Sequence, residues 1–372
     1  MASNRAKNKA KKAVKNFAKK NPVLAVVLAV IFIVVAIGGY FIYKELIKKP
    51  VVGAISFHFM TLGNKYSGDS IYIKAGDNDI LIDAGSREGS VTAISEYLND
   101  YVTDNTLEYV IVTHADRDHI AGFAKTNGGI FDLYDCQTII DFPKTNKTSD
   151  TYYDYVAERD AEVAKGAKHF TALECWGESK EGAQKVYQLA DSVTMEILYN
   201  DYYVESSTDE NNYSVCVQFT HGDRKFLFTG DLEKEGEQKL VAKNNLGQVE
   251  LYKAGHHASK TSSTNTLLNV IKPRVCVVTC SAGYNEYDAL HENVFPTQAF
   301  IDRISVWTDK VYVTTLGDPN FTGNESYVEM NGNVMVYSDE ESVKVECSNN
   351  NTLLKDTAWF IQNRTCPSSW AN

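Results

Sequence analysis

The chain has 372 residues, a formal net charge of −11 and a hydrophobic fraction of 44%. It contains no P-loop and no G-x-G-x-x-G fingerprint, which weighs against redox chemistry and against phosphoryl transfer from a nucleotide. None of the seven cysteines belongs to a C-x-x-C pair, although Cys347 and Cys366 could form one disulfide in an exported protein.

The first 49 residues are strongly basic, with 11 Lys and Arg and one Glu, so residues 50–372 carry a net charge of −21. An acidic domain of this kind does not attract a long polyanion by its general field, because nucleic-acid binding depends on the neutralisation of phosphates. Nucleic acid is therefore an allowed but disfavoured partner.

An uncharged run at residues 23–43 follows the basic segment 1–22. Its length matches a hydrocarbon core of roughly 30 Å, so we expect a transmembrane anchor there and a linker at 44–53. Because positive charge stays on the inner side, we expect a single-pass cell-membrane protein with a cytoplasmic N-terminus and an extracytoplasmic catalytic domain. Residues 36–40 match a signal-peptidase site poorly, which disfavours cleavage but leaves it open.

Short β-branched runs alternate with helix-like runs from residue 54 to residue 346, which predicts one large α/β domain followed by a tail at 347–372. The expected strands are residues 54–60, 70–74, 79–83, 108–113, 138–141, 193–199, 214–220, 225–229, 249–254, 275–280, 310–315, 333–337 and 342–346. The expected helices are residues 91–98, 152–165, 234–243, 264–270 and 295–304.

The most informative stretch is Thr-His-Ala-Asp-Arg-Asp-His at residues 113–119, directly after an apolar β-branched run. It places His114, Asp116, Asp118 and His119 where a strand ends, which is where α/β proteins hold their functional residues. Surface loops rarely concentrate metal ligands in this way. The stretch therefore predicts ligands for two metal ions in one shared pocket.

Two later strands also end in ligand residues. Residues 225–231 end in Thr-Gly-Asp231, and residues 250–257 end in Gly-His256-His257. If the second strand stays extended, its successive side chains alternate in direction. We therefore expect His256 to bind metal, and His257 to contact the substrate or donate a proton.

The order H-x-D-x-D-H, T-G-D and G-H-H resembles the metallo-β-lactamase fold, in particular the extracytoplasmic domain of ComEC-type competence proteins and their stand-alone relatives. Gly68-Asp69-Ser70, Leu81-Ile-Asp83-Ala-Gly85 and Asn211-Asn-Tyr-Ser214 add to the resemblance, which covers roughly residues 54–345. It implies an αββα sandwich with a metal site at one edge, here preceded by one transmembrane helix.

The resemblance also implies two divalent ions, with Asp231 as the bridging ligand. A histidine that completes the first site in many relatives is absent here, where Glu210 or Asn211 stands instead. This carboxylate-rich site keeps Zn²⁺ as the default and makes Mn²⁺ a competitor. The expected ligands are His114 and Asp116 in the first site and Asp118, His119 and His256 in the second, with Asp118 and His257 as the catalytic pair.

Four further residues are expected near the substrate, namely Asn211, Ser214, Ser259 and His291. The chain departs from its relatives at Ala258-Ser259, where they carry Gly-Ser, and around His291, where they carry His-Pro. These departures affect the identity of the substrate more than the metal site.

Three functions are compatible with this pattern. The first is a metal-dependent hydrolase of phosphodiesters, such as a nuclease, in which the ions activate water for in-line attack at phosphorus. The second is a phosphorylcholine-esterase-like hydrolase of cell-envelope headgroups, for which an acidic domain is no handicap. The third is a receptor without catalysis that retains the fold, which the intact ligand set disfavours because unpaired buried carboxylates cost stability.

Overall fold

The computed structural model describes residues 21, 22, 24, 53–284, 286, 290–317 and 327–371. The chain divides into two units, Met1–Pro50 and Val51–Asn372. The elements described below all belong to the second unit.

Two eight-stranded sheets form the domain. In the first sheet β3, β4, β5 and β6 run parallel, and the remaining neighbours are antiparallel. Its order is β16-β15-β1-β2-β3-β4-β5-β6. The strands are β1 (Ile55–Phe59), β2 (Ile71–Ala75), β3 (Asn78–Ile82), β4 (Thr106–Ile111), β5 (Asp135–Asp141), β6 (Lys168–Thr171), β15 (Val334–Ser338) and β16 (Val343–Cys347).

The second sheet has the order β14-β13-β12-β11-β10-β9-β8-β7, and its central strands β10 to β13 run parallel. Antiparallel strands flank this parallel core on both sides. The strands are β7 (Val186–Ala190), β8 (Val193–Ile197), β9 (Val217–His221), β10 (Arg224–Phe228), β11 (Leu251–Lys253), β12 (Val275–Ala282), β13 (Val311–Gly317) and β14 (Tyr327–Glu329).

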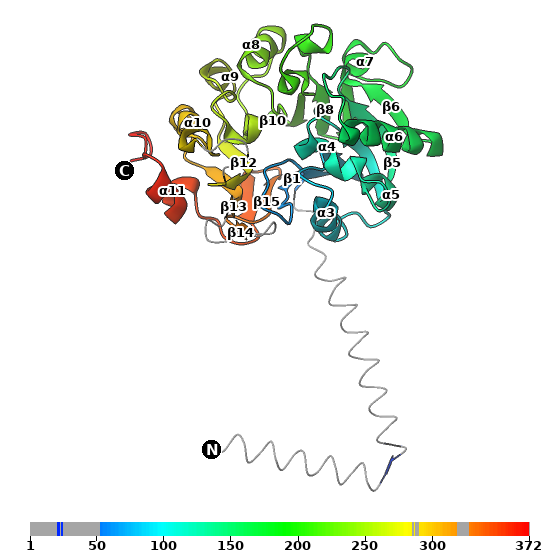
Figure 1. The fold of residues 1–372 in the computed structure, drawn as a ribbon, viewed down its shortest axis with the longest axis horizontal. Coiled ribbons are helices and arrows are strands. Elements are labelled where there is room, and N and C mark those ends of the chain that lie inside the picture. The colour runs from blue at the N-terminus through cyan, green and yellow to red at the C-terminus, as the bar shows by residue number, and fades with distance from the viewer. Residues whose placement is uncertain are drawn as a thin grey trace. The chain divides into compact units, whose positions relative to one another are not determined.

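Helices cover the outer faces of the two sheets, with α3 to α6 beside the first sheet and α8 to α10 beside the second (Figure 1). Phe360 in α11 and Trp370 pack into the apolar cluster beneath the second group. The helices are α3 (Ser90–Leu98), α4 (Arg117–Ala124), α5 (Ile130–Leu133), α6 (Asp150–Lys165), α7 (Ala172–Gly177), α8 (Lys234–Lys243), α9 (Asn265–Ile271), α10 (Gln298–Ile304) and α11 (Ala358–Asn363).

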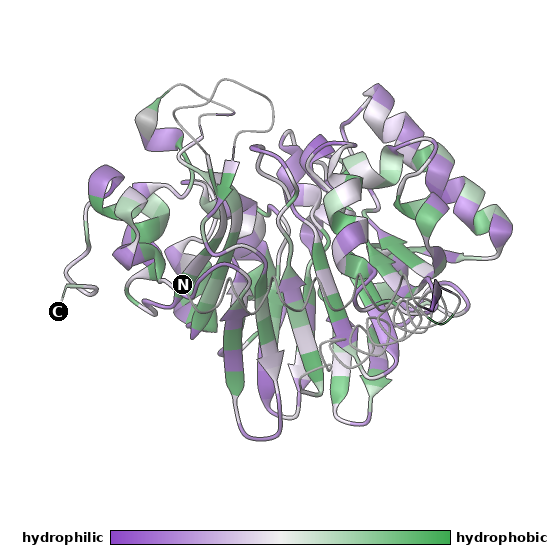
Figure 2. Cartoon of the chain, turned by 90° about the horizontal axis from the view of Figure 1, so that it is seen from below, coloured by the Kyte–Doolittle hydropathy of each residue, from purple (hydrophilic) through white to green (hydrophobic). Residues whose placement is uncertain are grey.

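Aromatic side chains join the two sheets face to face. The ring centroid of Phe57 in β1 lies 4.7 Å from that of Phe226 and 5.5 Å from that of Phe219. Both of these residues belong to the second sheet. All three side chains are fully buried, and hydrophobic residues run along the strands of both sheets (Figure 2). The expected two-sheet α/β architecture is therefore confirmed.

The expected transmembrane helix is not supported. Among the described residues, no helix combines the length and the hydrophobicity needed to cross a bilayer. The longest, α6, has 16 residues, which span about 24 Å at 1.5 Å per residue, against roughly 30 Å of hydrocarbon. Most of the expected anchor at 23–43 lies outside the described residues. The predictions of a membrane anchor and of a single-pass location derived from it are withdrawn.

Candidate metal centre

The candidate site lies where parallel strands of both sheets end. Asp83 follows β3, His114 follows β4, Asp231 follows β10 and His257 follows β11. Because the carboxyl ends of parallel strands gather at one edge of a sheet, these residues come together there, where α/β proteins bind ligands. His119, from the first turn of α4, completes the group.

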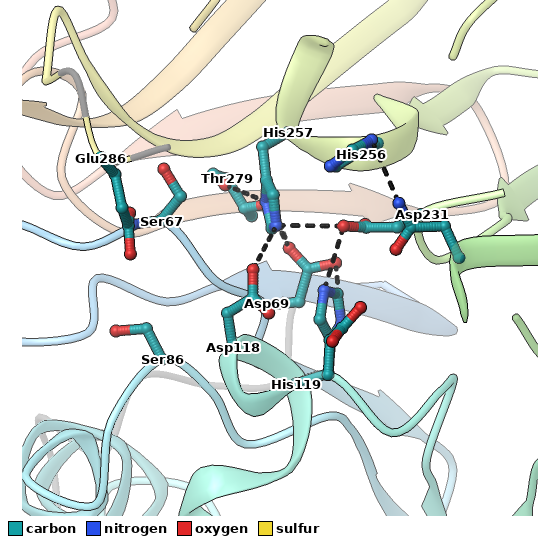
Figure 3. Close-up of polar contacts among 12 residues, drawn as sticks. Ser67, Asp69, Ser86, Asp118, His119, Asp231, His256, His257, Thr279 and Glu286 are labelled. Atoms are coloured by element: carbon teal, nitrogen blue, oxygen red, sulfur yellow. Dashed lines mark hydrogen bonds and ion pairs between the residues drawn. The ribbon is translucent and has the colours of Figure 1, made fainter. Parts of the chain in front are cut away.

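Four side chains, Asp118, His119, Asp231 and His257, form a compact cluster whose ligand atoms lie within 4.8 Å of one another. His119 Nε2 and His257 Nε2 each lie 3.2 Å from Asp231 Oδ2, and His257 Nε2 lies 3.3 Å from Asp118 Oδ2. Figure 3 shows the two imidazole rings turned toward the carboxylates from opposite sides. Both histidines are fully buried, and Asp231 is nearly so.

Hydrogen bonds orient both rings so that Nε2 points into the cluster. His119 Nδ1 lies 2.7 Å from Asp83 Oδ2, and His257 Nδ1 lies 2.8 Å from the carbonyl oxygen of Thr279. Since these oxygens can only accept, Nδ1 is the donor in each case. Ligand histidines in metalloproteins are held in the same way by a carboxylate or carbonyl.

A buried lysine supports the opposite side of Asp231. Lys253 Nζ lies 3.1 Å from Asp231 Oδ1, donates to the carbonyl of Gly230 at 3.2 Å, and forms an ion pair with Asp69. Asp69 also accepts a hydrogen bond from the hydroxyl of Thr279. These contacts fix the orientation of the Asp231 carboxylate.

Two glycine-containing loops pack closely against the backbone of Asp118 and fix its position. A Cβ at Gly85 would overlap the carbonyl oxygen of Asp118, and one at Gly68 would lie 2.7 Å from it. The amide of Asp69 donates to that same oxygen at 3.1 Å. Glycine is therefore required at both positions for the loops to close against the first turn of α4.

The charges of the cluster stabilise one another. Burial alone would raise the pKa of Asp231, but His257, His119 and Lys253 outweigh it and hold that pKa well below its usual range. Burial alone would lower the pKa of His257, but Asp231 and Asp118 outweigh it and raise that pKa to about 10. A metal ion that enters this site must displace the protons held there.

The residues fit a divalent cation. Apart from its ion-pair contact of 3.2 Å with Asp231 Oδ2, the buried His119 Nε2 has no hydrogen-bond partner within the described structure. A buried polar atom without such a partner is costly, and a metal ion would satisfy it. Two carboxylates and two imidazoles are a donor set suited to Zn²⁺ or Mn²⁺.

The expected first site is less complete. His114 Nε2 is likewise buried without a hydrogen-bond partner, and it lies 3.5 Å from Asp116 Oδ2. The other oxygen of Asp116 forms an ion pair with Lys147. Neither His114 nor Asp116 belongs to the four-residue cluster, although the ring centroids of His114 and His119 are only 4.1 Å apart.

His256 lies outside the cluster, whereas His257 lies within it. His256 Nδ1 is 3.0 Å from Glu233 Oε1, which also accepts hydrogen bonds from Asn211 and Thr261. Glu233 and Thr261 line a cavity of about 720 Å³, and His256 is partly exposed beside them. His256 and Asn211 thus both contact a glutamate that lines this cavity.

The remaining candidates lie close to the site or cannot be placed. Ser214 Oγ accepts from the amide of Asp231 at 3.1 Å, and Ser259 Oγ bonds with Thr261 Oγ1 at 2.9 Å. Glu210 accepts from Thr145 and from the amide of residue 146, so it is occupied by a neighbouring loop. His291 begins a 3-10 turn at His291–Asn293, and its side chain is outside the described structure.

Three buried residues of the site, Asp69, Asp83 and Lys253, were not assigned a role from the sequence. Asp69 and Asp83 lie in the Gly-Asp-Ser and Leu-Ile-Asp motifs, which were noted only for their resemblance. Lys253 could have indicated this buried network from the sequence, because a lone lysine in an apolar strand requires a buried anionic partner.

The class of the domain follows from this fold and this site. Residues 63–125 and 207–280 match the model of the metallo-beta-lactamase superfamily. The protein therefore contains a metallo-beta-lactamase domain, and that fold implies divalent metal ions at the cluster described above.

Curated relatives narrow the resemblance. The chain is 27% identical over 265 residues to competence protein ComA of Neisseria gonorrhoeae, covering 69% of this chain and 31% of that protein. It is 29% identical over 191 residues to ComE operon protein 3 of Bacillus subtilis, and this match covers 50% of this chain and 22% of that protein. The predicted similarity to ComEC-type competence proteins is confirmed, and the chain spans less than a third of these relatives.

A solved structure of similar fold is the metallo-beta-lactamase fold protein YhfI of Bacillus subtilis. It is 12% identical in sequence, and the match covers 69% of this chain and 95% of that one, with a TM-score of 0.41.

Proposed function

We propose that the protein is a metal-dependent hydrolase of phosphodiester bonds. The observation that carries the proposal is the buried cluster of Asp118, His119, Asp231 and His257, with both imidazole Nε2 atoms directed at the two carboxylates. The similarity to competence proteins agrees with a substrate that contains phosphodiesters. A nuclease is one form of this activity, although the charge of −21 over residues 50–372 favours short substrates over long polyanions.

Asp118, His119, Asp231 and His257 would hold one divalent ion, and His114 with Asp116 would contribute to a second. We therefore assign to His257 the metal-ligand role that we expected for His256. Bound divalent ions supply the Lewis acid that polarises a phosphoryl oxygen and activates water for attack at phosphorus. We keep Zn²⁺ as the default and Mn²⁺ as the competitor, because oxygen donors make up half of the cluster.

The residues of the chain orient the reaction. Lys253 and Ser214 hold Asp231 in place, and Asp83 holds His119 with its Nε2 directed inward. Burial excludes bulk water from this side of the site, which strengthens every charge interaction inside it. His256 contacts Glu233, which lines the cavity, and is assigned a contact with the substrate.

Metal removal tests the proposal. The purified full-length protein, loaded with Mn²⁺ or Zn²⁺, is expected to hydrolyse bis-p-nitrophenyl phosphate, and EDTA should abolish turnover until the metal is restored. Release of p-nitrophenolate and metal analysis by mass spectrometry are the measurements. Hydrolysis that persists in a protein shown to be free of metal would contradict the proposal, and so would a fully loaded protein without phosphodiesterase activity.

The adjacent histidines are expected to behave differently. Because His257 is buried against Asp118 and Asp231, His257→Ala should lose bound metal. His256→Ala should retain its metal and lose about tenfold in turnover, which corresponds to one hydrogen bond to the substrate. Metal content and kcat/KM of the matched pair are the readouts. If His256→Ala lost the metal and His257→Ala kept it, the two assignments would have to be exchanged.

A further inference from the structure

A group of aromatic and cationic side chains lies beside the metal centre and has no role in the function proposed above. We call it the tyrosine cluster: Lys65, Tyr66, Arg87, Tyr284 and Glu286. The rings of Tyr66 and Tyr284 meet edge to face with centroids 5.9 Å apart, and Lys65 Nζ lies 4.9 Å from the centroid of Tyr284. The guanidinium of Arg87 lies 3.9 Å from the centroid of Tyr66. Both tyrosines and both cations are half-buried.

The loops that carry the tyrosine cluster are the same loops that pack against Asp118. Tyr66 is three residues before Asp69, whose amide donates to the Asp118 carbonyl, and Arg87 is two residues after Gly85, which touches that carbonyl. Glu286 Oε2 accepts from the amide of Ser67 at 2.8 Å. In Figure 3, Ser67, Ser86 and Glu286 lie on the Asp118 side of the four-residue metal cluster, away from His256.

The two cations of the tyrosine cluster differ in their charge balance. Arg87 Nη2 forms an ion pair of 2.8 Å with Glu286 Oε1, so its charge is neutralised. Lys65 has no carboxylate partner within the described part of the chain. In a region of net charge −21, an unneutralised ammonium held over two aromatic rings favours an anionic ligand.

We propose that the tyrosine cluster is a nucleotide subsite of the metal centre: Tyr66 and Tyr284 hold the base of a substrate whose phosphate pairs with Lys65. Aromatic faces combined with basic groups are the means by which proteins bind single nucleotides and single strands. A quaternary ammonium ligand would meet Lys65 as a like charge, so the cluster disfavours phosphorylcholine. This subsite deepens the proposed hydrolase function and rests on it.

Two chromogenic substrates that share the same leaving group isolate the contribution of the base to kcat/KM. Thymidine 5′-(p-nitrophenyl phosphate) and methyl p-nitrophenyl phosphate both release p-nitrophenolate, but only the first carries a nucleoside. The Mn²⁺-loaded full-length protein is expected to prefer the nucleoside ester by roughly tenfold in kcat/KM, the order of one stacked base. Tyr284→Leu should lower this preference toward one. Lys65→Met should instead lower kcat/KM for both esters, because both carry the phosphate, and should keep the preference. Lys344→Met, which removes an exposed lysine of β16, is the control and should keep it.

Binding of thymidine 5′-monophosphate, measured by titration calorimetry on the metal-free proteins, is the second readout, and thermal unfolding verifies that each variant is folded. Weaker binding to both folded variants than to Lys344→Met supports the subsite. Equal kcat/KM for the two esters in the unmodified protein would overturn the subsite while the hydrolase function stands. A preference that survives Tyr284→Leu would place the base elsewhere. If neither ester is hydrolysed, the proposed function fails, and the calorimetric comparison alone decides the subsite.

Discussion

Asp231→Asn is expected to lower the metal affinity of the protein by more than about a hundredfold and to lower phosphodiester hydrolysis with it. Asp231 is the centre of the cluster, since its Oδ2 lies 3.2 Å from the Nε2 atoms of both His119 and His257. Asparagine preserves the shape but removes the charge that holds the two imidazoles and Lys253. Partners one step removed from a metal are already worth about 10–100-fold, so a ligand shared by both histidines should exceed that.

The measurement is metal content by mass spectrometry, together with the dissociation constant of Mn²⁺ by titration calorimetry. Asp223→Asn is the matched control, because Asp223 is an exposed aspartate in the neighbouring turn between β9 and β10. The control should bind metal as the unmodified protein does. Full metal content in Asp231→Asn would show that the Thr-Gly-Asp turn holds no ligand.

Much of the fold could be predicted because its signals are local. Amphipathic periodicity predicted the helix at 234–243 with the bounds that α8 has in the structure, and β-branched runs predicted β9 and β10 to within a few residues. The strand-end motifs brought Asp118, His119 and Asp231 into one site because parallel strands end at a common edge.

The contrast between His256 and His257 was not predictable from alternation. Alternation holds only while a strand stays extended, but β11 ends at Lys253 and the chain then turns sharply over Gly255–Ala258, where both histidines have non-helical backbone angles. His256 and His257 both have positive φ angles, 46° and 52°, as does Ala258. Left-handed conformations cost non-glycine residues about 1 kcal/mol or more each, so no propensity rule anticipates three in succession.

The contacts among Asp69, Lys253 and Asp231 depend on tertiary structure alone. Asp69 precedes β2 in the first sheet, whereas Lys253 ends β11 in the second, so their ion pair forms only when the two sheets pack. The expected membrane anchor failed for a different reason. It rested on the length of the uncharged run at 23–43 and on the basic segment before it, and no described helix has the required length and hydrophobicity.

Lys253→Met is expected to destabilise the metal-free protein by about 3–5 kcal/mol, the cost of removing one partner from a buried ion pair. Lys253 is 1% exposed and pairs with both Asp69 and Asp231. Methionine preserves the length and the apolar stem, so the change isolates the charge. Its loss leaves the Asp69 and Asp231 carboxylates without the ammonium that pairs with both, in a buried site where charge interactions are strongest.

Metal ions should reverse most of this loss, because a divalent cation at the cluster supplies the positive charge that the ammonium provided. The unfolding free energy of Lys253→Met should therefore rise more steeply with Mn²⁺ concentration than that of the unmodified protein. Urea unfolding with EDTA and with saturating Mn²⁺ measures both effects. Lys344→Met removes an exposed ion pair with Asp339 and should change stability by less than about 1 kcal/mol. An equal loss with and without metal would mean that Lys253 supports the fold independently of the metal site.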